Sequence, residues 1–313
     1  MLRLEGITKT YGAFTALDCV SLEVPDGAVF GLLGPNGAGK TSLIRIITRI
    51  AMRDSGTVLF DGRPMTDADV ARIGYLPEER GLYKKMKVGE QAVYLAQLKG
   101  MSKQEARLRS IAWFERWDMS GWWGKKVEEL SKGMAQKVQF ITTVLHGPKL
   151  LILDEPFSGF DPINADLVRT EILRLRDEGT TVMLSTHNMG SVEQLCDHIA
   201  LIDRSHKVLD GRVRDIQRAY GTNIYRVTFS GQLIGFTHAL WTGAELLDHT
   251  VEDERIEARV RLMQGTSVND LLTAVMPHVR IHGVREEVPT MHEVFIRAVG
   301  GDTPGREAEG PTE

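Results

Sequence analysis

Gly34-Pro-Asn-Gly-Ala-Gly-Lys-Thr41 is the stretch of sequence from which the fold can be inferred. It follows an apolar run at residues 28–33 and precedes residues 42–50, whose pattern predicts a helix. A glycine-rich turn between a strand and a helix directs backbone N–H groups at an anion, and the helix dipole adds positive potential. Lys40 adds a full charge, and Thr41 adds a hydroxyl suited to a phosphate-bound Mg²⁺. We expect a nucleoside triphosphate site here; a glycine turn that matches by accident is the weaker alternative.

Length and composition describe an ordinary globular protein. The 313 residues favour one large and one smaller domain, with 42% hydrophobic and 26% charged residues. A formal charge of −4 argues against nucleic acid as a partner. With only Cys19 and Cys196, a disulfide framework is not expected and a reducing compartment is favoured. No signal-peptide core opens the chain, and no apolar run approaches the ~20 residues of a membrane helix, so a membrane role would require a partner.

Strand-like and helical segments alternate up to residue 221, which predicts an α/β domain with a mixed, partly parallel sheet. Within it, residues 88–146 have an almost wholly helical pattern and are expected to form an inserted helical subdomain. Residues 222–300 predict a small α+β accessory domain, with strands expected at residues 223–230, 256–262 and 278–285 and helices at 268–276 and 289–299. Residues 301–313, rich in Gly, Pro and acids, predict a disordered tail.

A second candidate site is the run Leu150-Leu-Ile-Leu-Asp-Glu-Pro156, an apolar strand that ends in two acids. Asp154 at the tip of a buried strand could hold Mg²⁺ opposite Thr41. Glu155, one step further, could polarise a water for attack on the γ-phosphate. The alternative is a strand followed by a solvated acidic turn, which the upstream phosphate loop makes less favourable.

Three shorter motifs gain meaning only from their joint order. In Leu130-Ser-Lys-Gly-Met134, Ser131 is a natural N-cap and Gly133 frees backbone N–H groups for an anion. Ser158-Gly-Phe-Asp-Pro162 is a turn that opens a helix. His187 follows a strand pattern at residues 180–186. Taken singly, each is better explained as a structural feature.

In this order the motifs resemble the nucleotide-binding subunits of ATP-binding cassette (ABC) transporters, over residues 1 to about 220. The resemblance implies a P-loop NTPase cassette that hydrolyses ATP with Mg²⁺. It implies Glu155 as general base, His187 as γ-phosphate sensor, and Thr41, Glu78 and Asp154 around Mg²⁺. Ser131, Lys132 and Gly133 would complete the site of an opposite subunit, for which a second copy of the chain is favoured, with Asp161 in the D-loop. The implied ATP-binding residues, with Tyr11 stacking on adenine, are Tyr11, Gly34, Pro35, Asn36, Gly37, Ala38, Gly39, Lys40, Thr41 and Ser42.

The sequence departs from the family pattern at two places. The family signature is usually Leu-Ser-Gly-Gly-Gln. In this chain Lys132 replaces the first glycine and Met134 replaces the glutamine. Lys132 could neutralise phosphate or point to solvent, and solvent is the favoured alternative. Glu78 stands where the family usually has glutamine, which adds a third acid near one Mg²⁺. In the family this glutamine contacts Mg²⁺ and links the nucleotide site to the membrane partner. We expect Glu78 to keep that role, and we expect ATP hydrolysis to depend more strongly on Mg²⁺.

A finer resemblance is to the ATPases of sodium-export and drug-export systems, which work with a separately encoded membrane permease. It implies an exporter subunit at the cytoplasmic face of the cell membrane. Alternatives are a soluble ABC ATPase with a regulatory role and an accessory domain that senses a ligand. The helical insertion carries four tryptophans: Trp113, Trp117, Trp122 and Trp123. The first pair, at i, i+4 spacing, is expected to form the core of the subdomain; the alternative is a groove for a permease helix.

Overall fold

The computed structural model describes residues 1–79, 81–241 and 243–300. The chain divides into two compact units, Met1–Val213 and Arg214–Glu313. The predicted disorder of residues 301–313 concerns positions outside the described residues.

The central layer of the first unit is a six-stranded sheet in the order β10-β9-β3-β8-β7-β6. Neighbouring strands are parallel from β9 to β6, and only β10 runs antiparallel, beside β9. All residues of β3, β7 and β8 are buried, as the continuous apolar runs of a covered parallel sheet require. The strands are β3 (Val29–Leu33), β6 (Ile73–Leu76), β7 (Leu150–Asp154), β8 (Thr181–Thr186), β9 (His198–Asp203) and β10 (His206–Arg212).

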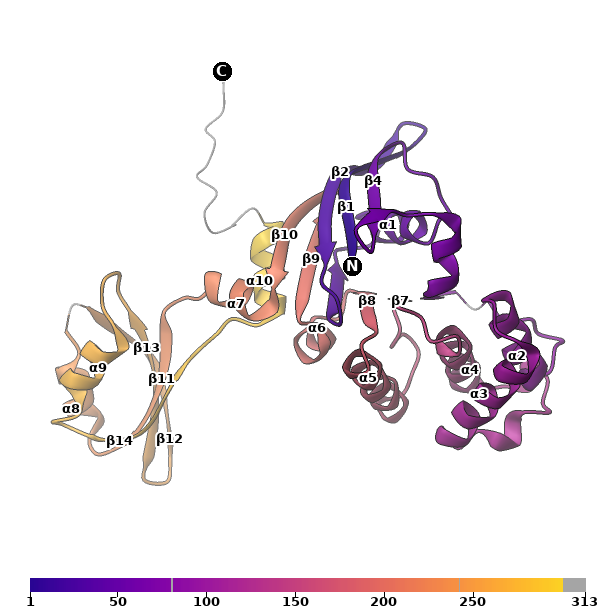
Figure 1. Cartoon of the computed structure of the whole chain (residues 1–313). Helices are drawn as coiled ribbons and strands as arrows, with labels where there is room; N and C mark the ends of the chain where they lie inside the picture. The colour runs from indigo at the N-terminus through magenta and orange to yellow at the C-terminus, as the bar shows by residue number, and fades with distance from the viewer. Residues whose placement is uncertain (80, 242, 301–313) are drawn as a thin grey trace, which may run out of the picture. The chain divides into compact units, whose positions relative to one another are not determined.

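A second, antiparallel sheet with the order β2-β1-β4-β5 lies beside the first. It consists of β1 (Leu2–Tyr11), β2 (Phe14–Val24), β4 (Ser55–Phe60) and β5 (Arg63–Pro64). Helix α1 (Lys40–Ile47) begins directly after the phosphate loop and buries four apolar side chains. These side chains share one core with residues of both sheets, so α1 is fixed from two sides (Figure 1).

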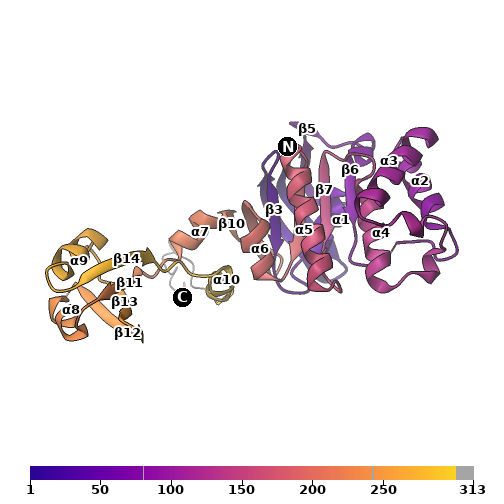
Figure 2. The same cartoon turned by 90° about the horizontal axis from the view of Figure 1, so that it is seen from below.

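Two further helices, α5 (Pro162–Asp177) and α6 (Met189–Leu195), belong to this unit. Figure 2 shows α6, α5 and α4 (Lys132–Val144) side by side along one face of the six-stranded sheet. Asp161 caps helix α5, because its side chain accepts a hydrogen bond from the backbone N–H of Asn164. Pro162 is the first residue of the helix, a position that proline favours. In the part of the chain that the structure describes, no helix is long and apolar enough to span a membrane.

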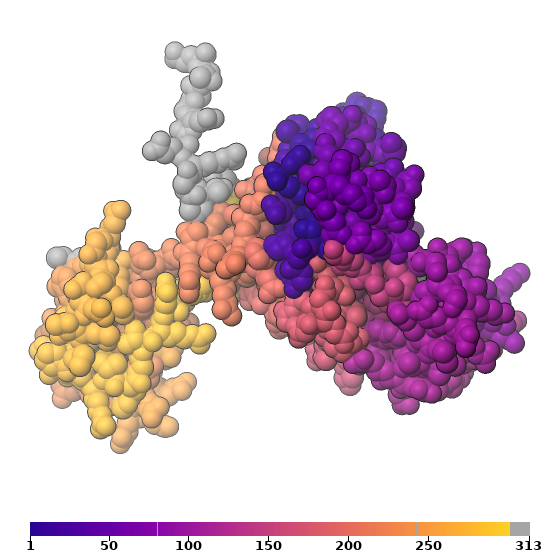
Figure 3. All heavy atoms as spheres, viewed as in Figure 1, coloured from indigo at the N-terminus to yellow at the C-terminus, as the bar shows by residue number. Residues whose placement is uncertain are grey.

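Residues 88–146 connect the neighbouring strands β6 and β7 and are helical, as expected. Apart from the single bridge between Lys87 and Lys126, the interval contains no strand. In Figure 3 these helices form a lobe at the edge of the unit. The helices are α2 (Val88–Leu98), α3 (Lys103–Arg116) and α4 (Lys132–Val144), with short 3₁₀ turns at Ser120–Trp122 and Val127–Glu129; a further 3₁₀ helix, Asp67–Arg72, precedes β6.

The tryptophans hold this lobe together. Trp117 is buried and stacks on Phe140 of α4 at a centroid distance of 5.2 Å. Trp123 contacts Phe114 edge-on, and a β-carbon on Gly89 would lie 2.2 Å from its ring. Aromatic packing of this kind is typical of a core. The interpretation as subdomain core therefore fits these tryptophans better than a permease groove does.

The second unit contains a four-stranded antiparallel sheet in the order β12-β13-β11-β14. Its element order is βαββαβ, the ferredoxin-like arrangement. Apolar side chains of the sheet, of α8 and of α9 form one core, which includes Phe229 stacked on Phe236. The elements are β11 (Ile224–Ser230), α8 (Leu233–Ala239), β12 (Ala244–Glu252), β13 (Arg255–Leu262), α9 (Val268–Val275), β14 (Arg280–Glu286) and α10 (Met291–Val299).

The second unit begins at Arg214, whereas the change in sequence character suggested residue 222. The reason is the packing of α7 (Val213–Ala219), a short helix that follows β10 and precedes β11 in the chain. Its residue Gln217 donates to the carbonyl of Pro289, and Arg297 of α10 donates to the carbonyl of Tyr220. These bonds attach the end of α7 to the C-terminal unit.

Candidate active site

A cavity of about 240 Å³ opens where the strands of the parallel sheet end. In open α/β sheets this edge is where ligands bind. The lining residues come from the start of β2, from the phosphate loop and the start of α1, from the end of β7 and from the segments after β6, β7 and β8, although these are distant in sequence. They are Phe14, Ala16, Asn36, Gly37, Gly39, Lys40, Thr41, Ser42, Glu78, Asp154, Glu155 and His187.

The shape of the phosphate loop depends on glycine at two positions. Gly34 has a φ of 147°, and a β-carbon there would lie 2.1 Å from the carbonyl oxygen of Ile202. Gly39 has a φ of 115°, and a β-carbon would lie 2.3 Å from the carbonyl oxygen of Ala16. Because any side chain would collide with backbone at both places, these glycines let the loop pack against the neighbouring segments.

Lys40 lies at the start of α1 and is 8% exposed. Its Nζ donates to the carbonyls of Gly34, at 2.7 Å, and Pro35, at 3.0 Å, so the ammonium is held inside the loop. Burial lowers the pKa of Lys40, and the carboxylates of Glu155, Asp154 and Glu78 oppose that shift. The loop therefore carries a positive charge at its centre with negative groups opposite.

Asp154 is 5% exposed at the tip of β7. The hydroxyl of Ser185, its partner in the register with β8, donates to Oδ1. Burial raises the pKa of Asp154, which the Ser185 bond and the charge of Lys40 counteract. Its carboxylate, the hydroxyl of Thr41 and the carboxylate of Glu78 line one cavity and are the hard oxygen donors that Mg²⁺ prefers.

Glu155 has a left-handed backbone with φ of 48°, which is uncommon for a non-glycine residue. Three donors fix its carboxylate. The backbone N–H of His187 lies 3.1 Å from Oε1, the hydroxyl of Thr186 lies 3.2 Å from Oε2, and Nδ1 of His187 lies 2.7 Å from Oε1. The two predicted catalytic residues thus contact each other directly at the cavity.

Glu78 lies in the segment that leads from β6 to the helical lobe, and its side chain is exposed at the cavity. The backbone of this segment is attached to α4, because Nε2 of Gln139 donates to the carbonyls of Pro77, at 3.4 Å, and Glu79, at 3.3 Å. A movement of the helical lobe would therefore be transmitted to Glu78.

The aromatic wall of the cavity differs from the sequence-based expectation. Phe14 and Ala16 of β2 line it, whereas Tyr11 lies opposite Phe14 in the hairpin register, with Nζ of Lys9 5.2 Å from its ring centroid. The adenine contact of Tyr11 stays a prediction. Phe14 went unrecognised because the motif that suggested Tyr11 ends before it; a second aromatic residue three positions on was the available signal.

The signature and D-loop residues lie outside this cavity. Ser131 caps α4, its hydroxyl accepting a bond from the backbone N–H of Met134, and Asp161 caps α5. Lys132 is exposed, but its side chain lies over Gly159. Both alternatives considered for Lys132, phosphate contact and free solvent exposure, omitted this neighbour. Within the described residues, none of Ser131, Lys132 and Gly133 lines the cavity of its own chain.

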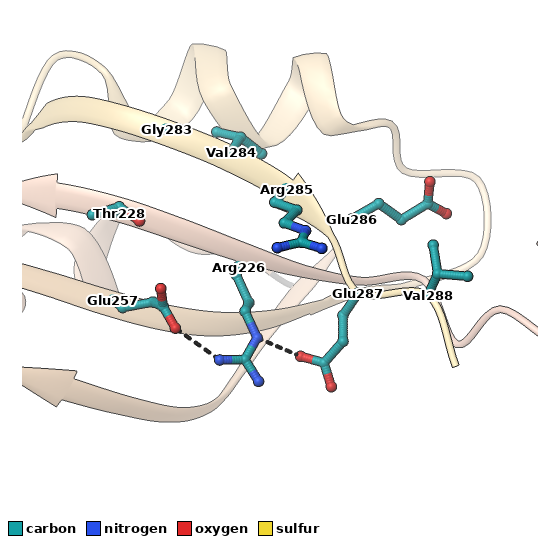
Figure 4. A pocket seen from close by; sticks show the side chains of 9 residues that line it. All are labelled: Arg226, Thr228, Glu257, Gly283, Val284, Arg285, Glu286, Glu287 and Val288. Carbon is teal, nitrogen blue, oxygen red and sulfur yellow. Dashed lines mark hydrogen bonds and ion pairs between the residues drawn. The ribbon is translucent and has the colours of Figure 1, made fainter. Parts of the chain in front are cut away.

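A larger hollow of about 600 Å³ lies on the open face of the C-terminal sheet (Figure 4). Its walls are charged, and most of these charges are paired. Arg226 bonds to Glu257 at 2.8 Å and to Glu287 at 3.0 Å, as the dashed lines show. Arg259 of β13 also pairs with Glu287, with 2.7 Å between its Nη2 and Oε1 of Glu287. This arrangement offers stability rather than a reaction centre.

Comparison with known proteins agrees with the geometry. Residues 17–158 match the family model described as ABC transporter, and residues 211–299 match the one described as ATP-binding protein DrrA1-3-like, C-terminal domain. The uncharacterized ABC transporter ATP-binding protein YhaQ of Bacillus subtilis is 38% identical over 300 residues, covering 96% of this chain and 99% of YhaQ. The linearmycin resistance ATP-binding protein LnrL of Bacillus subtilis is 30% identical, covering 96% and 98%.

Among solved structures, an ATP-binding subunit of an ABC transporter superposes with a TM-score of 0.65 at 27% identity, covering 70% of this chain and 93% of that one. The fold and site define an ABC-type nucleotide-binding cassette, which confirms the expected fold class. The chain belongs to the ABC transporter ATP-binding proteins, whose ATP hydrolysis is coupled to transport.

Proposed function

We propose that the chain is the ATPase subunit of an exporter and hydrolyses ATP at the cavity between the phosphate loop and β7. The observation that carries the proposal is the convergence of Lys40, Asp154, Glu155 and His187 on one cavity at the edge of the sheet. No single motif required that convergence.

In this proposal Lys40 and the loop amides bind the β- and γ-phosphates, and Thr41, Asp154 and Glu78 hold Mg²⁺. When bound, Mg²⁺ would neutralise phosphate charge and reduce the repulsion among the acids. Glu155 accepts a proton from the attacking water, and His187 stays hydrogen-bonded to Glu155 while its ring reaches the γ-phosphate. Fixed donors around the phosphates supply most of the rate.

We propose a head-to-tail dimer of two cassettes, most simply two copies of this chain. The support is that Ser131 and Gly133 lie outside the cavity of their own chain, so another subunit has to supply them. ATP would then be enclosed between the phosphate loop of one subunit and the signature segment of the other. Hydrolysis removes the γ-phosphate from this interface and lets it open.

The permease would dock at an apolar groove of about 340 Å³ between the nucleotide-binding core and the helical lobe. Tyr75, Pro77 and Leu98 are among its lining residues, so the groove is continuous with the segment that carries Glu78. Ile50 and Leu98 at its margin are each 63% exposed, which leaves apolar surface for a partner. We propose that this groove binds a short helix on the cytoplasmic side of the permease.

Leu98→Glu tests this docking, with Leu108→Glu as the matched control. Leu108 is 61% exposed on α3 and does not line the groove. Leu98→Glu should abolish co-purification with the cognate permease and leave ATPase activity in solution unchanged, while Leu108→Glu should co-purify like the wild type. Equal co-purification of all three proteins would refute the groove.

Two comparisons support export as the direction of transport. The relative LnrL is named a linearmycin resistance protein, and residues 211–299 match the DrrA1-3-like C-terminal domain. Inside-out membrane vesicles that contain the chain and its permease should accumulate an apolar drug or dye when ATP is added outside. Loss of preloaded compound from such vesicles would instead identify an importer. ATP hydrolysis without any permease-dependent flux would contradict a transport role.

A further inference from the structure

Two side chains at the start of α4 contact the D-loop of the same chain. Nε2 of Gln136 donates to the carbonyl of Ser158, and a β-carbon on Gly159 would lie 2.6 Å from Cε and 2.7 Å from Nζ of Lys132. Lys132 and Gln136 are four residues apart and therefore share one face of the helix. Together they cover the turn at Ser158 and Gly159.

That turn is directly connected to the general base. The backbone N–H of Ser158 bonds to the carbonyl of Glu155 at 3.1 Å, and that of Phe160 bonds to the carbonyl of Phe157 at 3.2 Å. Residues 155–160 thus form two successive turns that end at the cap of α5. A displacement of Ser158 and Gly159 would move the backbone of Glu155.

On the other side, Lys132 directly follows Ser131, the residue proposed to reach the ATP of a second subunit. The face formed by Lys132 and Gln136 therefore joins a segment that serves the partner's nucleotide to a turn that orients the base for the chain's own nucleotide. Packed side chains and hydrogen bonds of this kind can carry energetic coupling between two sites.

We propose that Lys132 and Gln136 are positioning residues that couple the signature segment to the turn after Glu155, so that each ATP site senses closure of the other. The inference rests on the proposed function as a dimeric ATPase. It gives the departure at Lys132 a role that is neither phosphate contact nor solvent exposure.

Gly159 supports this role. Its φ of 79° is left-handed, and a methyl group there would collide with Lys132. A side chain at position 159 would force the end of the Lys132 side chain to move from its place over the turn. Gly159→Ala should be less harmful once Lys132 is replaced by glycine, although the backbone strain remains.

The test measures ATP-driven dimer formation and the Hill coefficient of ATP hydrolysis in the full-length chain. Gln136→Leu and Lys132→Met should raise the ATP concentration for half-maximal dimer about tenfold and lower the Hill coefficient to about 1. Binding of a fluorescent ATP analogue to the monomer should not change, because neither residue lines the cavity. Lys132→Arg should preserve the wild-type behaviour.

A double-mutant cycle of Gly159→Ala and Lys132→Gly separates direct contact from general destabilisation. We expect the effect of Gly159→Ala on the dimer midpoint to be smaller in the Lys132→Gly background. Equal effects in both backgrounds, or an unchanged Hill coefficient in Gln136→Leu and Lys132→Met, would overturn the inference. If the wild-type chain neither hydrolyses ATP nor dimerises, the proposed function fails instead.

Discussion

The two units of the chain use the same charged residue types in opposite ways. In the cassette, Asp154 is buried at a strand tip and its pKa is raised by that burial. In the C-terminal unit, Glu287 bonds to Arg226 and Arg259 across three strands, and its pKa is lowered by those partners. In the cassette, burial disfavours the ionised form of Asp154, and a bound cation would stabilise that form. In the C-terminal unit, Glu287 is already paired with two arginines.

The comparison shows how a charged residue should be interpreted. A carboxylate whose ionised form is disfavoured in the ligand-free fold is a candidate for binding chemistry, because the fold alone does not stabilise it. A carboxylate whose ionised form is favoured stabilises the fold. Replacing a carboxylate by its amide should therefore have different consequences in the two units.

The largest contrast is expected for Glu155→Gln and Glu287→Gln in ATP hydrolysis. Glu155→Gln removes the group that accepts the proton from water, so the turnover number should fall about 10²- to 10⁴-fold. Glu287→Gln should hydrolyse ATP at the wild-type rate. Phosphate release in steady state measures both, and hydrolysis by Glu155→Gln at the wild-type rate would remove Glu155 from its role.

Glu78→Gln should change the Mg²⁺ dependence of ATPase activity several-fold. The amide keeps an oxygen ligand but removes one of three negative charges around the cavity, so less Mg²⁺ should be needed for half-maximal rate. A titration of the rate with Mg²⁺ at saturating ATP provides the measurement. An identical Mg²⁺ midpoint in variant and wild type would disprove the proposed effect of the extra charge.

Stability without nucleotide should change in opposite directions in the two units. Asp154→Asn removes a buried charge and should stabilise the cassette by about 1 kcal/mol, because burial disfavours ionised Asp154. Glu287→Gln breaks partly exposed ion pairs and should destabilise the C-terminal unit by about 1 kcal/mol or less. Hydrogen–deuterium exchange reports the two units separately. Destabilisation by both substitutions would contradict the comparison.

Acid should weaken the C-terminal unit through Glu287. The pKa of Glu287 is lowered from its ordinary value of 4.5, so its stabilisation is complete above 4.5 and is lost as pH falls through the lower, folded-state value. In Glu287→Gln this part of the acid dependence should be missing. Exchange rates in β11 and β13 between pH 6 and about pH 3 test it; the same pH slope in both proteins would refute the assignment.

Much of the cassette could be predicted from sequence because its motifs combine pattern with spacing. The apolar runs before Thr41 and Asp154 identified two buried strands, and the glycines identified the loop between strand and helix. Helical periodicity without strands identified the lobe at residues 88–146. The sequence could not show that these residues meet in one site. Glu155 and His187 are 32 positions apart and come together because β7 pairs with β8.

The C-terminal unit was less predictable for a physical reason. Strands β11, β13 and β14 correspond to the three expected strands, whereas β12 and α8 were not expected. Residues 244–252 carry five polar or charged side chains, because one face of an open antiparallel sheet is polar and β12 is an edge strand. Its pairing with β13, which no local pattern reveals, makes it a strand.

The central claim is that ATP closes a dimer across the cavity that contains Glu155. The most direct measurement is the molar mass of Glu155→Gln by light scattering after size-exclusion chromatography, with and without ATP and Mg²⁺. A monomer near 34.9 kDa without ATP should become a species of twice that mass with ATP, and Lys40→Ala in the same background should stay monomeric. A monomer under both conditions would contradict the account.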